Sequence, residues 1–259
     1  MAAVETQDPA QRFSLAGKVA LITGGSRGLG FAMAKGFAAA GADLAIASRD
    51  LDSCKQAAAE IEAQGRRAFP FACHVAHWEQ CDELVEAVYA QFGRVDVLVN
   101  NAGMSPIAPS SAETSEALYD KVLGVNLKGP FRLMALCGPR MAAGAGGAII
   151  NISSTASIRP TPQTAPYAAA KAGLNALTVA FAHEYGPKVR VNCIMAGPFH
   201  TDVSKSWSRS EWFTKQAKQS FALGRAGDPD EIVGAALYLA SDASSFTSGA
   251  VLRVDGGLP

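Results

Sequence analysis

A tyrosine and a lysine, Tyr167 and Lys171, are spaced four residues apart at the start of an alanine-rich helical stretch. This spacing places both polar ends on one helix face, about one turn apart. A free tyrosine has a pKa of about 10 and is a poor base at neutral pH, but a nearby ammonium stabilises its phenolate and lowers that pKa. The pair alone is also compatible with an ordinary surface helix. Ser154, however, ends an apolar run thirteen residues earlier. Its hydroxyl is therefore placed to donate to a carbonyl oxygen while Tyr167 supplies or removes a proton.

A glycine-rich turn follows the first apolar run, with the sequence Thr23-Gly24-Gly25-Ser26-Arg27-Gly28-Leu29-Gly30. Glycines at 24, 28 and 30 let the chain turn tightly and let its backbone approach a pyrophosphate at the N-terminus of the next helix. Any tight strand-to-helix turn can be glycine-rich, and the spacing is neither G-x-G-x-x-G nor a P-loop. The strand before it and the helix after it nevertheless favour dinucleotide binding over a structural turn.

Four potential metal ligands, Cys73, His74, His77 and Cys81, lie within nine residues. Zinc requires four ligands that converge at about 2.0–2.3 Å. This cluster straddles a predicted strand end and a predicted helix start, so its side chains are expected to point apart, and we predict no metal site. The chain has five cysteines and no C-x-x-C pair, which indicates reduced, packed thiols.

The elements that position these residues follow from the hydrophobic pattern. Short apolar runs alternate with helical patterns, such as the one-faced repeat from Cys81 to Phe92 and a similar one from Ile232 to Ala240. Because most runs are apolar on both faces, we predict a Rossmann-type, doubly wound α/β fold: a seven-stranded parallel sheet with helices on both faces. The predicted strands are Val19–Thr23, Leu44–Ser48, Ala68–Ala72, Val95–Asn100, Ala148–Ser153, Val189–Ile194 and Ala250–Val254.

The composition excludes several classes of protein. The chain has 259 residues, of which 49% are hydrophobic, and its 23 basic and 23 acidic residues cancel. Such a chain is neither disordered nor suited to wrapping nucleic acid. Its longest uncharged stretch, Met141–Ile158, contains too many glycines and hydroxyls for a membrane span, and its first twelve residues lack the apolar core of a secretory signal. We expect a soluble cytoplasmic protein.

No linker or repeat divides the chain, so we predict one catalytic domain over 15–259, preceded by a flexible extension over 1–14. Two segments interrupt the alternation at the ligand-binding edge of the sheet. The Pro/Ser-rich segment Met104–Ala112 is compatible with a plain surface loop. The segment Thr201–Gly227 carries two tryptophans, and we predict that it forms a substrate lid.

Together these motifs resemble the short-chain dehydrogenase/reductase family of the compact single-domain type, from about Phe13 to Gly257. The matching motifs are T-G-x-x-x-G-x-G at 23–30, N-N-A-G at 100–103, Asn126 in a helix, Ser154, Y-x-x-x-K at 167–171, the stretch 192–201 and V-D-G-G at 254–257. The resemblance implies an oxidoreductase that moves a hydride between a nicotinamide cofactor and a carbonyl/alcohol substrate.

The resemblance also implies a role for each of four catalytic residues. Tyr167 would be the general acid/base, and Ser154 would orient and polarise the substrate oxygen. Lys171 would lower the pKa of Tyr167 and bind the nicotinamide ribose. Asn126 would kink its helix and hold a water of a proton relay behind Lys171.

The cofactor residues that the resemblance implies mostly follow the predicted strands, at the edge of the sheet where those strands end. Two departures from the family pattern stand among them: His74 replaces the common acidic residue after the third strand, and Ala196-Gly197 replaces Pro-Gly. The implied contacts are Gly24, Ser26, Arg27, Gly28, Leu29, Gly30, Ser48, Arg49, His74, Val75, Asn101, Ala102, Gly103, Lys171, Pro198, Phe199 and Thr201.

The residues around the end of the second strand predict NADP(H) rather than NAD(H). An NAD enzyme places an Asp or Glu there to bind the ribose hydroxyls, and in the family pattern that position is Ser48. The guanidinium of Arg49 suits a 2′-phosphate, and Arg27 can approach the same phosphate. Asp50 competes as an NAD-type ligand but suits a helix N-cap better. The alternative is that both arginines are solvated surface charges.

Alternatives remain for the activity. A cofactor-binding protein without turnover, or an epimerase or dehydratase with the same Tyr–Lys chemistry, is less compatible with the full motif set and the short chain. Among reductases we favour a small free ketone or alcohol, such as a sugar acid or a hydrophobic ketone. Reduction of 3-oxoacyl chains on an acyl carrier protein is second, because 141–147 lacks Lys and Arg, although Lys188 and Arg190 follow. The family usually forms homotetramers, which we expect here.

Overall fold

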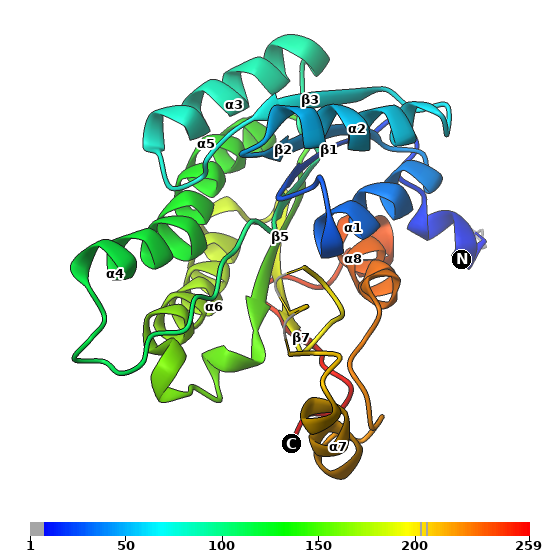
Figure 1. The fold of residues 1–259 in the computed structure, drawn as a ribbon. Coiled ribbons are helices and arrows are strands. Elements are labelled where there is room, and N and C mark those ends of the chain that lie inside the picture. The colour runs from blue at the N-terminus through cyan, green and yellow to red at the C-terminus, as the bar shows by residue number, and fades with distance from the viewer. Residues whose placement is uncertain (1–7, 203, 206) are drawn as a thin grey trace.

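The seven strands of the computed structural model lie parallel in one sheet, in the order β3-β2-β1-β4-β5-β6-β7 (Figure 1). The structure describes residues 8–202, 204–205 and 207–259. The predicted fold class is confirmed, and β6 continues two residues beyond the predicted end. The strands are β1 Val19–Thr23, β2 Asp43–Ser48, β3 Ala68–Ala72, β4 Val97–Asn100, β5 Gly147–Ser154, β6 Val189–Ala196 and β7 Val251–Val254.

The strand order places a switch point beside β1, which has β2 on one side and β4 on the other. The chain runs outward from β1 to β3, returns to β4, and then runs outward the other way. The loops after β1 and β4 therefore leave the sheet in opposite directions. A crevice forms at this point in open α/β folds, outside the carboxyl ends of the strands.

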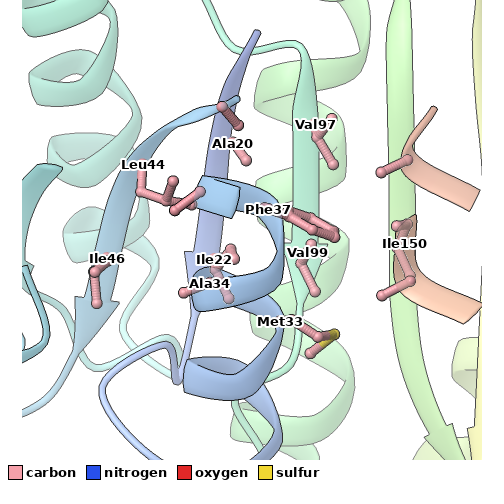
Figure 2. Close-up of a cluster of buried hydrophobic side chains, with 14 of the residues drawn as sticks. Ala20, Ile22, Met33, Ala34, Phe37, Leu44, Ile46, Val97, Val99 and Ile150 are labelled. Atoms are coloured by element: carbon pink, nitrogen blue, oxygen red, sulfur yellow. The ribbon is translucent and has the colours of Figure 1, made fainter. Parts of the chain in front are cut away.

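Helices cover both faces of the sheet because most strands are buried on both sides. Helices α1, α2 and α8 pack on one face, and α3, α5 and α6 on the other. Figure 2 shows Met33 and Phe37 of α1 packed over Ile22 and Val99 of the sheet. These helices are α1 Gly28–Ala39, α2 Leu51–Glu62, α3 Trp78–Phe92, α5 Gly129–Ala143, α6 Ala165–Tyr185 and α8 Val233–Ala240.

The remaining elements lie in the connections. Helix α4, Glu116–Leu123, continues into α5 through a π-helical turn at Gly124–Lys128, and α7, Glu211–Ser220, lies beyond the end of the sheet (Figure 1). Short 3-10 helices occur at Pro9–Phe13, Thr155–Ser157, Pro162–Thr164, Pro229–Ile232 and Asp242–Ser244.

The segment predicted as a flexible extension, 1–14, is described from residue 8 onward, and residues 1–7 lie outside the described residues. Asp8 accepts a hydrogen bond from the Ala10 amide. Arg12 donates to the Asp242 carbonyl and to Ser245 Oγ. Residues 8–14 are therefore attached to the domain, through polar contacts that the sequence did not predict.

The five cysteines are free and buried. Cys73 and Cys81 contact one another in the core, whereas the rings of His74 and His77 pack edge to face with centroids 4.8 Å apart. Within the described part of the chain, no three His, Cys, Asp or Glu side chains are grouped for a metal ion. None of the described helices is long and apolar enough to cross a membrane.

Candidate active site

Four polar side chains meet where β5 and α6 approach the loop after β4. Ser154 ends β5, and Tyr167 and Lys171 lie on the first turns of α6. The hydroxyl of Ser154 lies near enough to that of Tyr167 to shift its pKa, and Lys171 Nζ lies 5.7 Å from the centroid of the Tyr167 ring. A methyl group at Gly103 would lie 3.1 Å from Asn126 Oδ1 and 3.7 Å from Lys171 Nζ. The structure therefore brings the predicted catalytic residues to one corner.

Burial sets the electrostatics of this corner. Lys171 is 3% exposed, and its Nζ donates to the Ile152 carbonyl oxygen at 2.8 Å. Desolvation of the ammonium lowers the pKa of Lys171 to about 8. The pKa of Tyr167 is raised above its ordinary value, because burial of the phenolate outweighs the hydrogen bond from Ser154, which lowers it.

The expected lowering of the Tyr167 pKa by Lys171 is therefore wrong for the chain by itself. The ammonium is desolvated and committed to a backbone carbonyl, and it is not among the groups that shift the pKa of Tyr167. Sequence spacing places the two residues on one helix face but says nothing of their burial. Because burial disfavours the phenolate, Tyr167 is a proton donor at neutral pH in this state.

Asn126 is held inside the π-helical turn between α4 and α5 and is fully buried. Its Nδ2 donates to the carbonyl oxygens of Met104 and Val122, each at 2.9 Å, and its Oδ1 accepts from the Met104 amide. A π-turn widens the helix and is frequent at functional sites. Here it frees the Val122 carbonyl for the side chain and fixes the loop after β4 behind Lys171.

The glycine-rich turn is tight for identifiable reasons. Gly24 and Gly28 have φ of +62° and +55°, a region that side chains disfavour. A Cβ at Gly30 would lie 2.2 Å from the Gly24 carbonyl oxygen and 2.4 Å from Asn101 Nδ2. Only glycine lets α1 begin so close to the turn. Leu29 instead packs its side chain against the hydrophobic core.

Asn101 and Thr23 connect this turn to β4. Asn101 Nδ2 donates to the carbonyl oxygens of Thr23 and Gly24, at 3.0 and 3.1 Å. The hydroxyl of Thr23 accepts from the amides of Asn101 and Ala102 and donates to Val99. The sequence predicted only that the backbone of 101–103 lines the cofactor. The supporting role of the Asn101 side chain and of Thr23 was missed, although both belong to the quoted motifs.

The start of α1 fits the pyrophosphate of a dinucleotide. Its N-cap, Arg27, makes no capping hydrogen bond through its side chain. The first amides of the helix consequently keep their donors for an anion, and the helix dipole favours negative charge there. The glycine cradle and the uncapped helix start together leave room for the group that the motif predicts.

The end of β2, where the sequence predicts the adenosine of the cofactor, gathers hydroxyl and cationic groups; we call it the adenosine end. Ser26 Oγ donates to Ser48 Oγ at 3.1 Å. Arg49 is exposed, and its charge contributes to lowering the pKa of His74, after desolvation and His77. Asp50 accepts from the Ser53 amide at 2.7 Å and caps α2. The predicted N-cap is confirmed, so the carboxylate that competed as an NAD-type ligand is occupied.

Arg27, which we predict to approach the cofactor phosphate, pairs within the protein with an acidic residue. Its guanidinium lies 3.7 Å from the Asp202 carboxylate, and the two side chains are 66% and 59% exposed. Exposed pairs of this kind are weak, so the arginine remains available to a stronger anion. Val75 is buried, and its carbonyl lies against Gly129 at the start of α5.

The loop after β6 crosses the start of α1. The Thr201 side chain lies 3.6 Å from the position that a Cβ at Gly28 would take. Phe199 is 6% exposed and packs in the core, so it presents its backbone rather than its ring to the crevice. Pro198 accepts from the Gly227 amide at 3.0 Å. Gly197 packs on Asp255, where a Cβ would not fit.

The predicted lid, 201–227, forms a small core of its own from Trp207, Phe213, Ala217, Phe221 and Ala226. The rings of Trp207 and Phe213 lie edge to face with centroids 5.0 Å apart. Trp212, in contrast, is 69% exposed. Within this segment residues 203 and 206 lie outside the described residues.

A glycine-rich turn at a sheet switch point, together with a corner of Ser, Tyr, Lys and Asn at the same edge of the sheet, is typical of a Rossmann-type oxidoreductase. A family model described as Enoyl-(Acyl carrier protein) reductase matches residues 24–259. The chain is 34% identical to human Dehydrogenase/reductase SDR family member 4, over 96% of this chain and 90% of that protein. It belongs to the short-chain dehydrogenase/reductase family.

Two further similarities differ in the substrate named. The 3-oxoacyl-[acyl-carrier-protein] reductase of Chlamydia trachomatis is 39% identical, over 94% of this chain and 98% of that protein. The crystal structure of a gluconate 5-dehydrogenase from Burkholderia cenocepacia, in complex with NADP and tartrate, is 34% identical. It aligns with a TM-score of 0.92 over 97% of this chain and 98% of that chain.

Proposed function

We propose that the protein transfers a hydride between a nicotinamide cofactor and a carbonyl/alcohol substrate, with Ser154, Tyr167, Lys171 and Asn126 as its catalytic residues. The observation that carries this proposal is their convergence beside Gly103, at the end of the crevice that starts at the glycine turn. The nicotinamide supplies or accepts the hydride when the cofactor is bound.

In the direction of reduction, the Ser154 hydroxyl donates to the substrate carbonyl oxygen and polarises it. Tyr167 gives its phenolic proton to that oxygen as negative charge develops. Lys171 would bind the ribose and return a proton to Tyr167 from water. Asn126, which holds the loop after β4 beside Lys171, would position that water. The raised pKa of Tyr167 keeps the proton on the phenol until the substrate oxygen needs it.

The cofactor in this proposal is NADP(H) rather than NAD(H). Ser48 cannot repel a 2′-phosphate, and Ser26, Ser48 and the exposed Arg49 supply donors for one. The NADP complex of the gluconate 5-dehydrogenase supports this choice. Calorimetry with NADPH and NADH tests it, and tighter binding of NADH by the unmodified protein would contradict it.

The cofactor contacts in this proposal are the glycine turn, the adenosine end (Ser48, Arg49, His74, Val75), the loop after β4 (Asn101, Ala102, Gly103) and Pro198, Phe199 and Thr201 after β6. The backbone supplies most of them, since Val75 and Phe199 bury their side chains and Leu29 packs its side chain, partly buried, against the core.

The substrate in this proposal is a small free ketone or alcohol, such as a sugar acid. The loop 104–112 beside the catalytic corner carries no charged residue that could hold an acidic carrier. The segment 141–147, which also lacks Lys and Arg, precedes β5 and so lies at the opposite end of the sheet from Ser154, where Lys188 Nζ donates to the Gly144 carbonyl oxygen. It therefore does not bear on docking at the site. A 3-oxoacyl chain on a carrier protein is the second candidate, which the Chlamydia trachomatis relative favours. Nicotinamide absorbance with a panel of free ketones and carrier-bound acyl chains separates them. A protein that binds NADPH and turns over nothing would be a non-catalytic binder.

We also propose a homotetramer in the cytoplasm. An apolar groove of about 370 Å³ runs over α5 and α6 on the outside of the domain, as a face shared with a second copy would. The groove is lined by Leu123, Leu127, Lys128, Phe131, Gly173 and Leu177. Light scattering that gives a mass of one chain, 26.9 kDa, would contradict the tetramer. Cell fractionation tests the compartment.

A further inference from the structure

One polar residue of α6, Asn175, continues the series of Tyr167 and Lys171 but has no part in the proposed proton transfer. It follows Lys171 by four residues, and so lies on the same face of the helix. It is half-buried, at the level where the 3-10 turn Thr155–Ser157 packs against α6.

A directed chain of hydrogen bonds passes through Asn175. The Cys193 thiol of β6 donates to Asn175 Oδ1 at 3.5 Å, which leaves the amide NH₂ facing the turn. Asn175 Nδ2 donates to Ser157 Oγ at 3.0 Å, and Ser157 Oγ donates to the Ser154 carbonyl oxygen at 2.6 Å. Each group in this chain donates in one direction only, so the orientation of the amide and both hydrogen positions are fixed.

The chain ends on Ser154, whose hydroxyl faces Tyr167. Ser154 Oγ accepts from the Ala156 amide at 3.2 Å, so its own proton is left for the Tyr167 oxygen and, in the proposed function, for a substrate oxygen that takes its place. The position of that hydroxyl depends on the turn 154–157, since the strand ends at Ser154. The turn is attached to α6 through Ser157 and Asn175, the same helix that carries Tyr167 and Lys171.

We propose that Asn175 and Ser157 are positioning residues that lock the turn after Ser154 onto α6, and so fix the Ser154 hydroxyl against the Tyr167 hydroxyl. The inference rests on the proposed function, because it assigns these two residues to the same hydride-transfer site. A displacement of a reacting group by about 1 Å costs on the order of 100-fold in rate. Two hydrogen bonds outside the site thereby control its chemistry.

The test compares Asn175→Leu and Ser157→Ala with Thr178→Val on the same helix. Thr178 accepts from Asn151 and donates to Leu174, so its valine variant removes buried hydrogen bonds of α6 without touching the turn. We expect Asn175→Leu and Ser157→Ala each to lower kcat by roughly 10- to 100-fold. NADPH affinity should stay within about twofold of wild type, well under the tenfold that 1.4 kcal/mol represents. Thr178→Val should keep its kcat.

Two further readouts separate positioning from general destabilisation. The hydrogen bond from Ser154 lowers the pKa of Tyr167. In the Asn175→Leu and Ser157→Ala variants this bond is loosened, so the acidic limb of the pH profile of kcat for alcohol oxidation should move to higher pH. The double variant should be no worse than either single one, because both break the same chain.

Several results would overturn the inference. One is a kcat of Asn175→Leu equal to that of Thr178→Val. Another is a pH profile of kcat whose acidic limb does not move in the variants. A third is a double variant in which the two losses of kcat add. If Asn175→Leu does not fold, Ser157→Ala, which removes one small hydroxyl, decides alone. A wild-type protein that binds NADPH but turns over no substrate would overturn the proposed function as well, whereas full turnover by Ser157→Ala and Asn175→Leu would overturn this inference only.

Discussion

The catalytic corner and the adenosine end of the crevice are built in opposite ways. At the corner, Lys171 and Asn126 are almost fully buried and each makes hydrogen bonds within the protein. At the adenosine end, Arg49 is exposed, and the half-buried Ser48 hydroxyl accepts from Ser26 and donates to the Asp50 carbonyl oxygen. The catalytic corner is fixed before any ligand binds. The adenosine end presents an exposed guanidinium, which becomes ordered only when a ligand binds it.

The difference follows from the role that we propose for each region. Proton transfer needs groups held in place to a fraction of an ångström, which buried hydrogen bonds provide. Recognition of a phosphate needs charge and reach, which an exposed guanidinium provides at a small cost in stability. Changes at the corner should therefore affect kcat, and changes at the adenosine end should affect cofactor binding.

Tyr167→Phe is the strongest test of this contrast. It removes the proton that the substrate oxygen needs and leaves the ring packing intact, so kcat should fall by roughly 100- to 10,000-fold. Cofactor affinity measured by calorimetry should stay near the wild-type value. Retained turnover would remove Tyr167 from its proposed role.

Arg49→Leu should show the reverse pattern. A hydrogen bond to a charged group contributes about 1.5–3 kcal/mol, so NADPH binding should weaken roughly 10- to 150-fold. NADH binding should change far less, because NADH lacks the 2′-phosphate. Adding Ser48→Asp should turn the preference toward NADH. Arg27→Leu, which removes the second arginine predicted near the same phosphate, serves as the comparison. If Arg49→Leu weakens the binding of NADPH and NADH equally, the assignment of Arg49 to the 2′-phosphate is contradicted.

The burial of Lys171 predicts a dependence of stability on pH. Its pKa is about 8 in the folded protein, against 10.5 as the ordinary value. The unfolded chain therefore binds more protons between these two values, and stability rises with pH across this range. From pH 7 to pH 9 the free energy of unfolding of wild type should rise by about 1 kcal/mol more than that of Lys171→Met. Denaturant titrations at both pH values measure this, and parallel changes in the two proteins would refute it.

The lid segment should give the smallest effect on stability. Trp212 is 69% exposed, so Trp212→Ala should change the free energy of unfolding by less than about 0.5 kcal/mol. If the segment closes over substrate, KM should rise in this variant while kcat and NADPH affinity are kept. Phe213→Ala, which removes a ring from the small core, is the destabilising control. An unchanged KM for every substrate would leave 201–227 as a plain connection.

The fold and the motif positions could be predicted from the sequence, because continuous apolar runs and period-3.6 patterns both record burial directly. Val19–Thr23 and Ala68–Ala72 form strands with the predicted bounds. Three features could not be predicted. The raised pKa of Tyr167 depends on desolvation in three dimensions. The pairing of Arg27 with Asp202 depends on where a long loop returns. The Asn175–Ser157 contact joins two elements that no spacing rule relates.

The pairing of β1 with β4 also sets an order of events during folding. Ala20 lies opposite Val97, so this contact closes a loop of more than seventy residues, while β2 and β3 pair much closer along the chain. Long closures are entropically expensive and form late. The glycine turn reaches its final place only when Asn101 of the incoming strand binds it. A nascent chain should thus acquire its nucleotide only after its central strands have joined, and the nucleotide then stabilises the completed sheet by mass action.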